Sequence, residues 1–431
     1  MSEDWHDAIQ RYLSGSANRE ESVALQEALK NDADLRLLYL DCLNLELALE
    51  AKAESIGGVA EIVPITDLPS APQSRSRPMR RLLAVAAAAA LLLFLGTLFF
   101  KSASEPAAWV WQASGTQAVS VGEPLSPGRV VNLTNGQIRI RFDWGAILAA
   151  EAPAEFSVLG GNSARLIHGQ VTVRVPGKKK GFTVMTPTER VIDLGTSFGV
   201  DVAPSGATEI SVFEGEVKLG AEKRLTAGQS VEVAEARADP REIPYSERAY
   251  SDTWQISFGV EALTGKVRLA APSERRSPGK VHDSESLLLF PERERVSIAR
   301  GDRVDAIEPG LHQRPFHKRV ITLREDQTVD SFLLQYNPER SGDKLEKRRF
   351  EGELRFDRPI IALILQKDLL NVSDAHMALP GVDFQNIYRR GIAVFDQVEL
   401  SADRRILRVA FDIKDGVDQI RVLVASDNNS L

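Results

Sequence analysis

Cysteine is nearly absent from this chain of 431 residues, and its absence removes two kinds of structural support. Cys42 is the single cysteine, so no disulfide can form within the chain. A zinc site built from several thiolates is excluded for the same reason. The chain is long enough for two or three domains with apolar cores of their own, so we expect its stability to come from packing.

Two common catalytic motifs are also missing. The sequence contains no glycine-rich phosphate loop of the Gly-Lys-Ser/Thr type and no His-Glu-x-x-His motif. We therefore predict that the protein is not an enzyme, and we assign it no cofactor and no metal ligands. A pair of carboxylates on a sheet face remains the alternative, because glycoside hydrolysis needs little more than such a pair.

Basic residues are scarce at the start of the chain. Residues 1–72 hold 14 acidic and 5 basic side chains, whereas the whole chain has a net charge of −7. An acidic segment of this kind is not expected to bind nucleic acid directly. It suits either a basic protein partner or an ordinary solvated surface, and charge alone does not separate the two.

Long apolar runs are missing everywhere except at residues 82–100. These 19 residues contain no charged residue and no proline, and they predict a transmembrane helix. Four arginines lie within residues 75–81, whereas only Lys101 follows the run closely. The positive-inside rule therefore predicts a single-pass protein of the inner (cytoplasmic) membrane, with a cytoplasmic N-terminus and a periplasmic C-terminus. A buried helix of a soluble domain and a secretory signal peptide are the alternatives.

Apolar residues repeat at helical spacing before this run. The pattern predicts three short amphipathic helices, which would form a small all-α cytoplasmic domain over residues 1–54. So small a bundle often completes its core by holding a partner. Residues 55–81 are rich in glycine, proline and serine and end in basic residues, so they predict a flexible linker.

The apolar period changes to two after the membrane run. Short alternating runs separated by Asn-Gly, Gly-Gly and Pro-Gly turns predict an all-β roll or solenoid over residues 108–235. A polar stretch follows, and strand-like runs return over residues 250–431, where they predict a β-sandwich. The expected fold class is therefore multidomain: an all-α bundle, one transmembrane helix and two all-β exported domains.

Two stretches of the first β domain resemble the FecR domain. They read Asp193-Leu194-Gly195-Thr196-Ser197-Phe198-Gly199-Val200 and Val212-Phe213-Glu214-Gly215-Glu216-Val217. The resemblance implies a protein that senses an envelope signal and relays it to a cytoplasmic sigma factor. The residues assigned to the family motif are Asp193, Leu194, Gly195, Thr196, Phe198, Gly199 and Gly215.

The order of the parts also resembles the anti-sigma factors found with FecR-type sensors. It implies that the helical domain binds an ECF-type sigma factor, whereas an unknown envelope protein or glycan would be read outside. The sequence lacks the His-x-x-x-Cys-x-x-Cys motif of the zinc-binding relatives, so such binding would be zinc-free. We assign the sigma-factor contact to Leu35, Leu38, Tyr39 and Leu45.

Two alternatives remain open. Some FecR relatives cleave themselves at a Gly-Thr bond, which makes Gly195 and Thr196 a candidate cleavage site, although tight-turn roles for these residues are the commoner case. The rival function is a membrane-anchored glycan- or surface-binding protein without a regulatory role. Trp109, Trp111 and Trp144 could stack on sugar rings in that case, although packing is the commoner role of such residues.

Overall fold

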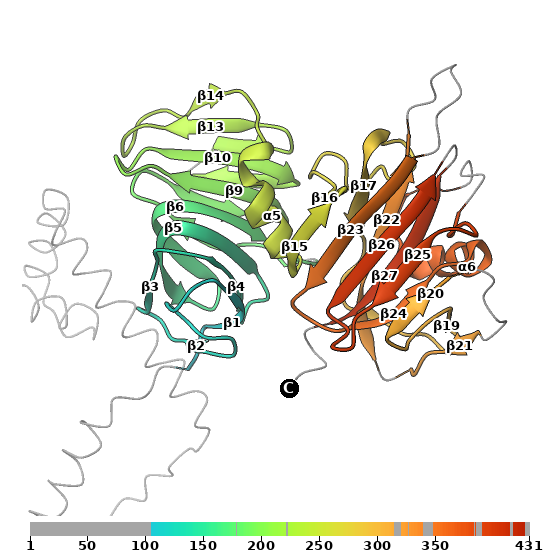
Figure 1. Cartoon of the computed structure of the whole chain (residues 1–431). Coiled ribbons are helices and arrows are strands. Elements are labelled where there is room, and N and C mark those ends of the chain that lie inside the picture. Colours follow the sequence, from blue (N-terminus) through green and yellow to red (C-terminus); the bar gives the residue numbers. More distant parts are fainter. Residues whose placement is uncertain are drawn as a thin grey trace, which may run out of the picture. The chain divides into compact units, whose positions relative to one another are not determined.

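The computed structural model describes residues 105–431, except for 178, 221–222, 314–319, 326, 339–347, 383, 385–389, 414–416 and 427–431. All of the described residues belong to one compact unit, Leu98–Leu431 (Figure 1). The predicted helical domain (1–54), linker (55–81) and apolar run (82–100) lie outside the described residues.

The fold class predicted from the sequence is wrong for the part of the chain that the structure describes. The regular structure of that part is mostly β-sheet, and its helices are η1 (Arg248–Tyr250), α5 (Ser251–Ser257) and α6 (Lys367–Met377). It therefore holds no all-α bundle. None of these helices is long and apolar enough to cross a membrane.

Helix α6 also corrects the expectation of a helix-free C-terminal domain. It buries Leu369, Leu370 and Met377 on one side. Their spacing suits a helical stripe, but the stripe covers only three turns and follows directly on a strand-like run. The short helix was therefore not separated from the strands around it.

The first fourteen strands form one large sheet with the order β12-β11-β8-β7-β6-β5-β4-β1-β2, and the other five strands branch from it. Strand β3 branches from β5. The other four branch from β6, whose first residues pair in parallel with β7 and whose later residues pair antiparallel with β9. The sheet thereby folds back on itself around a single apolar core. The strands are β1 (Ala108–Ser114), β2 (Pro124–Leu125), β3 (Val130–Leu133), β4 (Gln137–Phe142), β5 (Ile147–Gly160), β6 (Ser163–Arg174), β7 (Thr183–Met185), β8 (Arg190–Asp193), β9 (Ser197–Val202), β10 (Thr208–Glu214), β11 (Glu216–Leu219), β12 (Lys223–Thr226), β13 (Ser230–Val233) and β14 (Arg241–Ile243).

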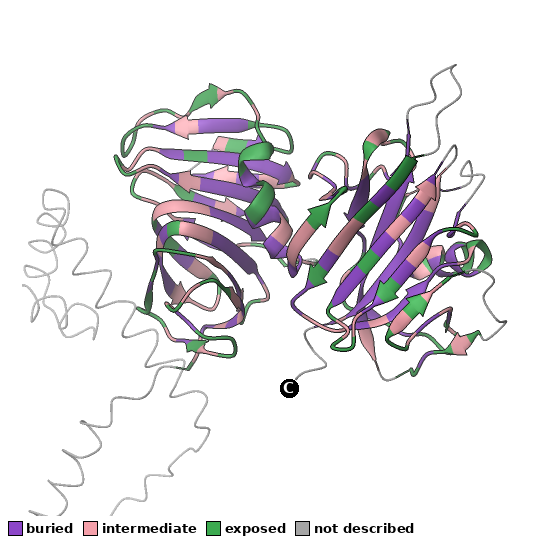
Figure 2. Cartoon of the chain, in the orientation of Figure 1, coloured by how far each residue is buried: buried purple, intermediate pink, exposed green. Residues whose placement is uncertain are grey.

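Period-two alternation explains how these strands build the core. Ile138, Ile140 and Phe142 on β4 all belong to it and are fully buried. Figure 2 shows buried segments alternating with less buried ones along several strands. Arg139 alternates onto the opposite face and is nevertheless only 1% exposed. The outer face of this part of the sheet is therefore covered as well.

The remaining strands form two main sheets and a two-stranded one. The five-stranded sheet has the order β15-β23-β26-β25-β20, and the six-stranded sheet has the order β16-β17-β22-β27-β24 with β18 beside β22. Apolar side chains of both main sheets share one core, as in a β-sandwich. The strands are β15 (Val260–Gly265), β16 (Val267–Leu269), β17 (Asp283–Pro291), β18 (Val296–Ser297), β19 (Arg303–Val304), β20 (Gly310–His312), β21 (Ile321–Thr322), β22 (Thr328–Asn337), β23 (Arg348–Phe356), β24 (Ile360–Ile364), β25 (Gln397–Leu400), β26 (Ile406–Ile413) and β27 (Asp418–Ala425).

Strands β22 and β27 are buried on both faces, because α6 and neighbouring segments cover the side of their sheet away from the sandwich core. This second face contains buried charge. The Arg421 guanidinium is fully buried and forms ion pairs with Glu292 at 2.7 Å and with Asp374 of α6 at 2.9 Å. Pairing is what allows such charges to be buried.

Helix α5 and the 3-10 turn before it connect the fourteen-stranded sheet to β15. Trp254 of α5 is buried and packs edge to face against Phe213 of β10 and against Phe258. Strand β14 lies within the polar stretch that was expected to separate two domains. The boundaries at 108–235 and 250–431 stay predictions.

Candidate functional site

The motif residues build the tight connection between β8 and β9. Asp193 is fully buried at the end of β8, and its Oδ1 accepts hydrogen bonds from the Gly195 amide at 2.9 Å and from the Thr196 hydroxyl. An aspartate that binds the backbone two residues later is a common way to fix a turn. The Asp193 side chain therefore sets the geometry of Gly195 and Thr196.

Burial perturbs the Asp193 carboxyl. Desolvation raises its pKa above the ordinary value, and the hydrogen bonds from Thr196 and Gly195 offset this only in part. Its Oδ2 is buried and has no hydrogen-bond partner among the described residues. Both observations indicate that this carboxyl is protonated more readily in the folded protein than in the unfolded chain.

The two turn glycines of the motif lie against each other. Gly195 has a φ of +105° and Gly215 has a φ of +78°, which favours glycine at both positions. A Cβ atom on Gly215 would lie 3.0 Å from Cγ2 of Thr196 and closer still to the Gly195 carbonyl oxygen. The β8–β9 turn therefore needs a glycine at the start of β11.

Gly199 has a different reason to be glycine. Its Cβ would lie 2.6 Å from Cζ of the Tyr250 ring, and closer to two other ring atoms. The Tyr250 ring, in the segment that leads into α5, thus packs directly against the backbone of β9 at Gly199. Phe198 points to the other side, into the core, and the Leu194 amide donates to the Glu216 carbonyl at 3.0 Å.

The structure therefore brings the predicted motif residues together. In contrast, Leu35, Leu38, Tyr39 and Leu45, which were assigned to the sigma-factor contact, lie outside the described residues.

The candidate cleavage bond Gly195–Thr196 has one of the two features that cleavage needs. The Thr196 hydroxyl donates to the Asp193 carboxyl, a group that could accept its proton. Gly195 adopts a backbone conformation that glycine tolerates, so its φ indicates no strain in the bond. Cleavage stays a hypothesis, and a turn-forming role accounts for the described contacts.

The motif also has the spacing Gly195-x-Ser197-x-Gly199, which is that of the nucleophile elbow in α/β-hydrolases. That elbow requires a turn from a strand into a helix, with the serine exposed. Here Ser197 is buried and begins β9, after a turn between two strands. The structural context of the elbow is absent from this segment.

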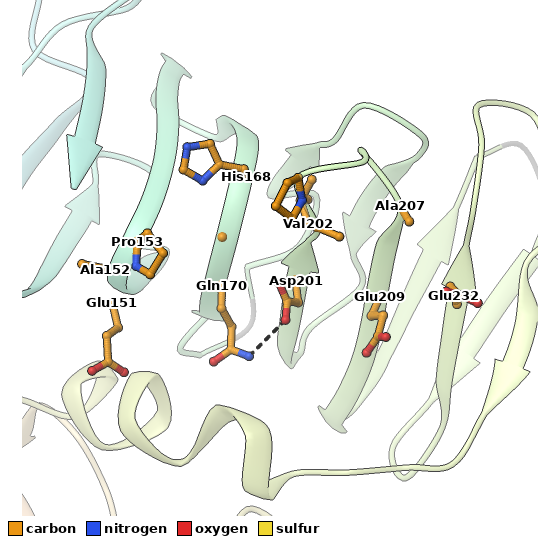
Figure 3. Close-up of a pocket in the computed structure, with 13 residues that line it drawn as sticks. Glu151, Ala152, Pro153, His168, Gln170, Asp201, Val202, Ala207, Glu209 and Glu232 are labelled. Atoms are coloured by element: carbon orange, nitrogen blue, oxygen red, sulfur yellow. Dashed lines mark hydrogen bonds between the residues drawn. The ribbon is translucent and has the colours of Figure 1, made fainter. Parts of the chain in front are cut away.

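A row of four acidic residues and one glutamine on the fourteen-stranded sheet was not foreseen. Glu151, Gln170, Asp201, Glu209 and Glu232 lie directly opposite one another on the adjacent strands β5, β6, β9, β10 and β13 (Figure 3). Together with neighbouring residues they line an open groove of about 480 Å³. In the sequence, these residues only mark polar positions of strands with alternating apolar and polar residues. That pattern does not show how neighbouring strands are aligned, so the row could not be predicted.

The charges in this row repel one another. Burial raises the pKa of Asp201, and its 3.5 Å hydrogen bond from the Gln170 amide offsets this in part. Partial burial also raises the pKa of Glu209. The charges of Asp201 and Glu232 on either side add to this effect, and the Arg241 guanidinium, which pairs with Glu232, offsets part of it. Chemically the groove favours a cationic group. No group of three or more His, Cys, Asp or Glu residues in the described part of the chain is arranged to hold a metal ion.

Three arginines join the fourteen-stranded sheet to the C-terminal strands and explain the buried outer face. Arg139 of β4 pairs with Asp357, Arg174 of β6 pairs with Glu294 at 2.6 Å, and Glu214 of β10 pairs with Arg275 at 2.9 Å. The sequence places such residues on an outward face, but it does not say what covers that face. All three pairs were therefore missed.

The Arg174–Glu294 pair is the most strongly perturbed of the three. Burial alone would raise the pKa of Glu294, but the charge and hydrogen bonds of Arg174 outweigh it, and Arg275 and Arg358 add to the effect. The pKa of Glu294 is thereby lowered to about 2. Arg174 also lies 3.6 Å from the ring centroid of Phe258 and donates to the Ser257 hydroxyl and carbonyl.

Comparison with known proteins gives one informative match. The sequence profile of the family described as FecR protein matches residues 129–218, a range that includes every residue of the predicted motif. No curated protein matches the chain.

Two crystal structures of a protein from Parabacteroides distasonis, provisionally described as an anti-sigma factor, were found among the solved structures. Each shares 16% sequence identity with the chain and has a TM-score of 0.25. They cover 35% of this chain and 68% and 69% of the other. A likeness this weak carries no argument about fold or function.

The resemblance to FecR that the motifs predicted is thus confirmed by the profile match. Residues 129–218 are the part of the chain that is similar to the FecR protein family.

Proposed function

We propose that the protein is a regulatory signal transducer that binds an ECF-type sigma factor and responds to an envelope signal. The FecR match over residues 129–218 is the observation that supports this role. The proposed signal is an envelope protein or glycan read by the described β part. The proposed activity is binding and relay, without catalysis, and it requires no direct contact with nucleic acid.

The proposed location is the inner membrane, with the N-terminus in the cytoplasm and the C-terminus in the periplasm. The clustering of arginines within residues 75–81, ahead of the apolar run, supports this orientation. The proposed sigma-factor contact comprises Leu35, Leu38, Tyr39 and Leu45. The strong negative charge of residues 1–72 would complement a basic face on that partner.

Capture of the full-length chain from its own cells tests the proposal. The chain carries a C-terminal tag, complexes are cross-linked before lysis, and co-purified proteins are identified by mass spectrometry. We expect a sigma factor to be recovered with the unmodified chain and to be lost with Leu38→Asp or Leu45→Asp. Leu311→Asp is the matched control, because it makes the same change at a leucine that is exposed on β20.

The opposite result would favour the rival function. If no sigma factor is recovered with a correctly folded chain, the protein is better described as an anchored glycan- or surface-binding module. Loss of the sigma factor with Leu311→Asp as well would show that the capture does not depend on the proposed contact.

A further inference from the structure

One exposed aromatic side chain is not explained by the packing of the fold. Trp144 lies in the turn between β4 and β5 and is 40% exposed. The ammonium group of Lys179 lies 5.2 Å from the centroid of its ring. Lys179 and Lys180 are exposed in the segment between β6 and β7. We call Trp144, Lys179 and Lys180 the Trp144 patch.

Backbone hydrogen bonds fix the turn that carries Trp144. The Trp144 amide donates to the Gly161 carbonyl at 2.9 Å, and the Gly145 amide donates to the Phe142 carbonyl at 2.7 Å. The Phe142 amide in turn donates to the Ala146 carbonyl at 2.9 Å. An exposed aromatic residue on a fixed turn loses little conformational entropy when it meets a surface.

The patch lies close to the point where the described chain begins. The Asp143 amide, directly before Trp144, donates to the Ala107 carbonyl at 2.9 Å. The apolar run ends at Phe100, seven residues earlier. A fully extended chain of this length spans at most about 25 Å. Any surface that holds residues 82–100 therefore lies within short reach of Trp144.

The chemistry of the patch suits the headgroup region of a bilayer. Tryptophan is enriched at membrane–water interfaces because its ring is apolar and its N–H is polar. Lysine side chains are attracted to the negative surface of an anionic bilayer. Lys178, Lys179 and Lys180 are consecutive in the sequence.

We propose that the Trp144 patch contacts anionic phospholipid headgroups and thereby sets the orientation of the FecR domain against the membrane. This proposal rests on the membrane location given under Proposed function. The short tether keeps the patch at high effective concentration near the bilayer, so a weak contact is sufficient. Release of the patch from the lipid would change the orientation of the domain without unfolding it.

Fluorescence quenching by brominated lipids tests the contact. The full chain is reconstituted in vesicles of phosphatidylglycerol and phosphatidylcholine that carry bromine near the headgroups, and its tryptophan emission is compared with that of Trp144→Phe. The difference isolates Trp144. We expect clear quenching of this component, and a severalfold smaller effect in Lys179→Glu/Lys180→Glu and in vesicles of phosphatidylcholine alone.

The matched control is Lys266→Glu/Lys280→Glu, which reverses two exposed lysines among the C-terminal strands and should leave the quenching unchanged. If the protein floats with the vesicles but the unmodified chain and Trp144→Phe are quenched equally, the lipid contact of Trp144 is overturned and the membrane location is not. Protein that does not float with the vesicles would overturn both this proposal and the membrane location. Flotation on a density gradient separates the two outcomes.

Discussion

Gly215 and Gly228 both have left-handed backbone conformations, but only one of them is crowded. Gly215, with a φ of +78°, faces the Gly195 carbonyl and the Thr196 methyl group. Gly228, with a φ of +85°, has nothing within 4 Å of the position of a Cβ. The pair separates the cost of the backbone conformation from the cost of a steric clash.

We expect Gly215→Ala to lower the free energy of unfolding by more than Gly228→Ala. The left-handed conformation alone costs an alanine about 1–2 kcal/mol, which Gly228→Ala should show. Gly215→Ala adds displacement of the β8–β9 turn, for a total of about 3 kcal/mol or more. Urea unfolding followed by tryptophan fluorescence measures both. Equal losses would mean that the turn does not pack against Gly215 as described.

Asp193 makes a prediction about pH. Its pKa in the folded protein is raised above 3.8, so the folded state binds the proton more tightly than the unfolded state. The stability that this adds is complete below about pH 4 and is lost as the pH rises through the folded pKa. Asp193→Asn cannot titrate but can still accept both hydrogen bonds at its Oδ1.

The difference in unfolding free energy between Asp193→Asn and the unmodified chain should therefore shift in favour of asparagine as the pH rises from about 4 to neutral. Measuring the difference at each pH cancels the titration of all other groups. A difference that is constant with pH would contradict the perturbed carboxyl. A Thr196→Val variant, which removes one hydrogen bond to Asp193, should raise the pKa of Asp193 further and enlarge the total change across this pH range.

At the scale of the element, the acidic row opposes the pairing of its own strands. Glu209 lies directly between Asp201 and Glu232 on neighbouring strands. Like charges in such cross-strand positions destabilise a sheet. Arg241 pairs with Glu232 and offsets part of this repulsion, whereas no ion pair is found for Glu209 itself among the described residues.

Glu209→Gln should therefore raise the free energy of unfolding near neutral pH by about 0.5–1 kcal/mol. The matched control is Glu216→Gln, in which the removed charge is paired with Arg224 at 3.0 Å, so no gain is expected. Thermal or urea unfolding at pH 7 and at pH 4 checks the result, and the gain should shrink at pH 4 as Glu209 becomes protonated. Destabilisation at pH 7 would show that the row holds a cation or another favourable contact.

Strand β4 is joined to the C-terminal strands by a buried ion pair. The side chains of Arg139 and Asp357 are 1% and 4% exposed. Asp357 also accepts a hydrogen bond from Arg358 at 3.0 Å. Arg358 pairs in addition with Asp330 at 2.7 Å, so replacing Asp357 still leaves Arg358 with a partner. Removing one member of a buried pair costs about 3–5 kcal/mol, because the other charge stays buried.

A double-mutant cycle with Arg139→Met and Asp357→Asn should therefore be clearly non-additive, with the double variant losing much less than the sum of the two single losses. The exposed pair Arg224–Glu216, whose side chains are 63% and 33% exposed, serves as the control and should couple by about 1 kcal/mol or less. Additive losses at the buried pair would mean that the two strands are not joined through it.

At the scale of the whole molecule, Glu294 gives the described unit a defined acid sensitivity. Its pKa is lowered from 4.5 to about 2, so the folded state binds the proton less tightly than the unfolded state. The stability from the Arg174–Glu294 pair is therefore present above about pH 4.5 and is lost as the pH falls toward about 2. This sign is opposite to that of Asp193.

The loss of stability in Glu294→Gln should be large near neutral pH and should shrink as the pH falls from about 4.5 to about 2. Unfolding measured across this range, for both chains side by side, checks the expectation. A loss that stays constant with pH would show that Glu294 acts through packing alone. Glu285 is a suitable exposed comparison, since it pairs with Arg348 at 2.8 Å on the surface of the C-terminal strands.

Much of the β architecture and the FecR motif could be read from the sequence, because both depend on local chemistry. Ile138, Ile140 and Phe142 point to one side of β4 whatever lies around them. A residue such as Gly195 marks a turn because few others tolerate its backbone conformation. The sigma-factor contact and the membrane orientation remain predictions, since they concern residues outside the described ranges.

The tertiary structure alone decided what covers the outer face of the strands. Arg139 and Arg174 alternate outward in the sequence like any solvated residue, yet both are buried against carboxylates more than 100 positions away. Gly199 is required by the Tyr250 ring, and the acidic row arises from the register of five strands. A period of two assigns side chains to two faces, but only the packing of distant segments determines which faces meet water.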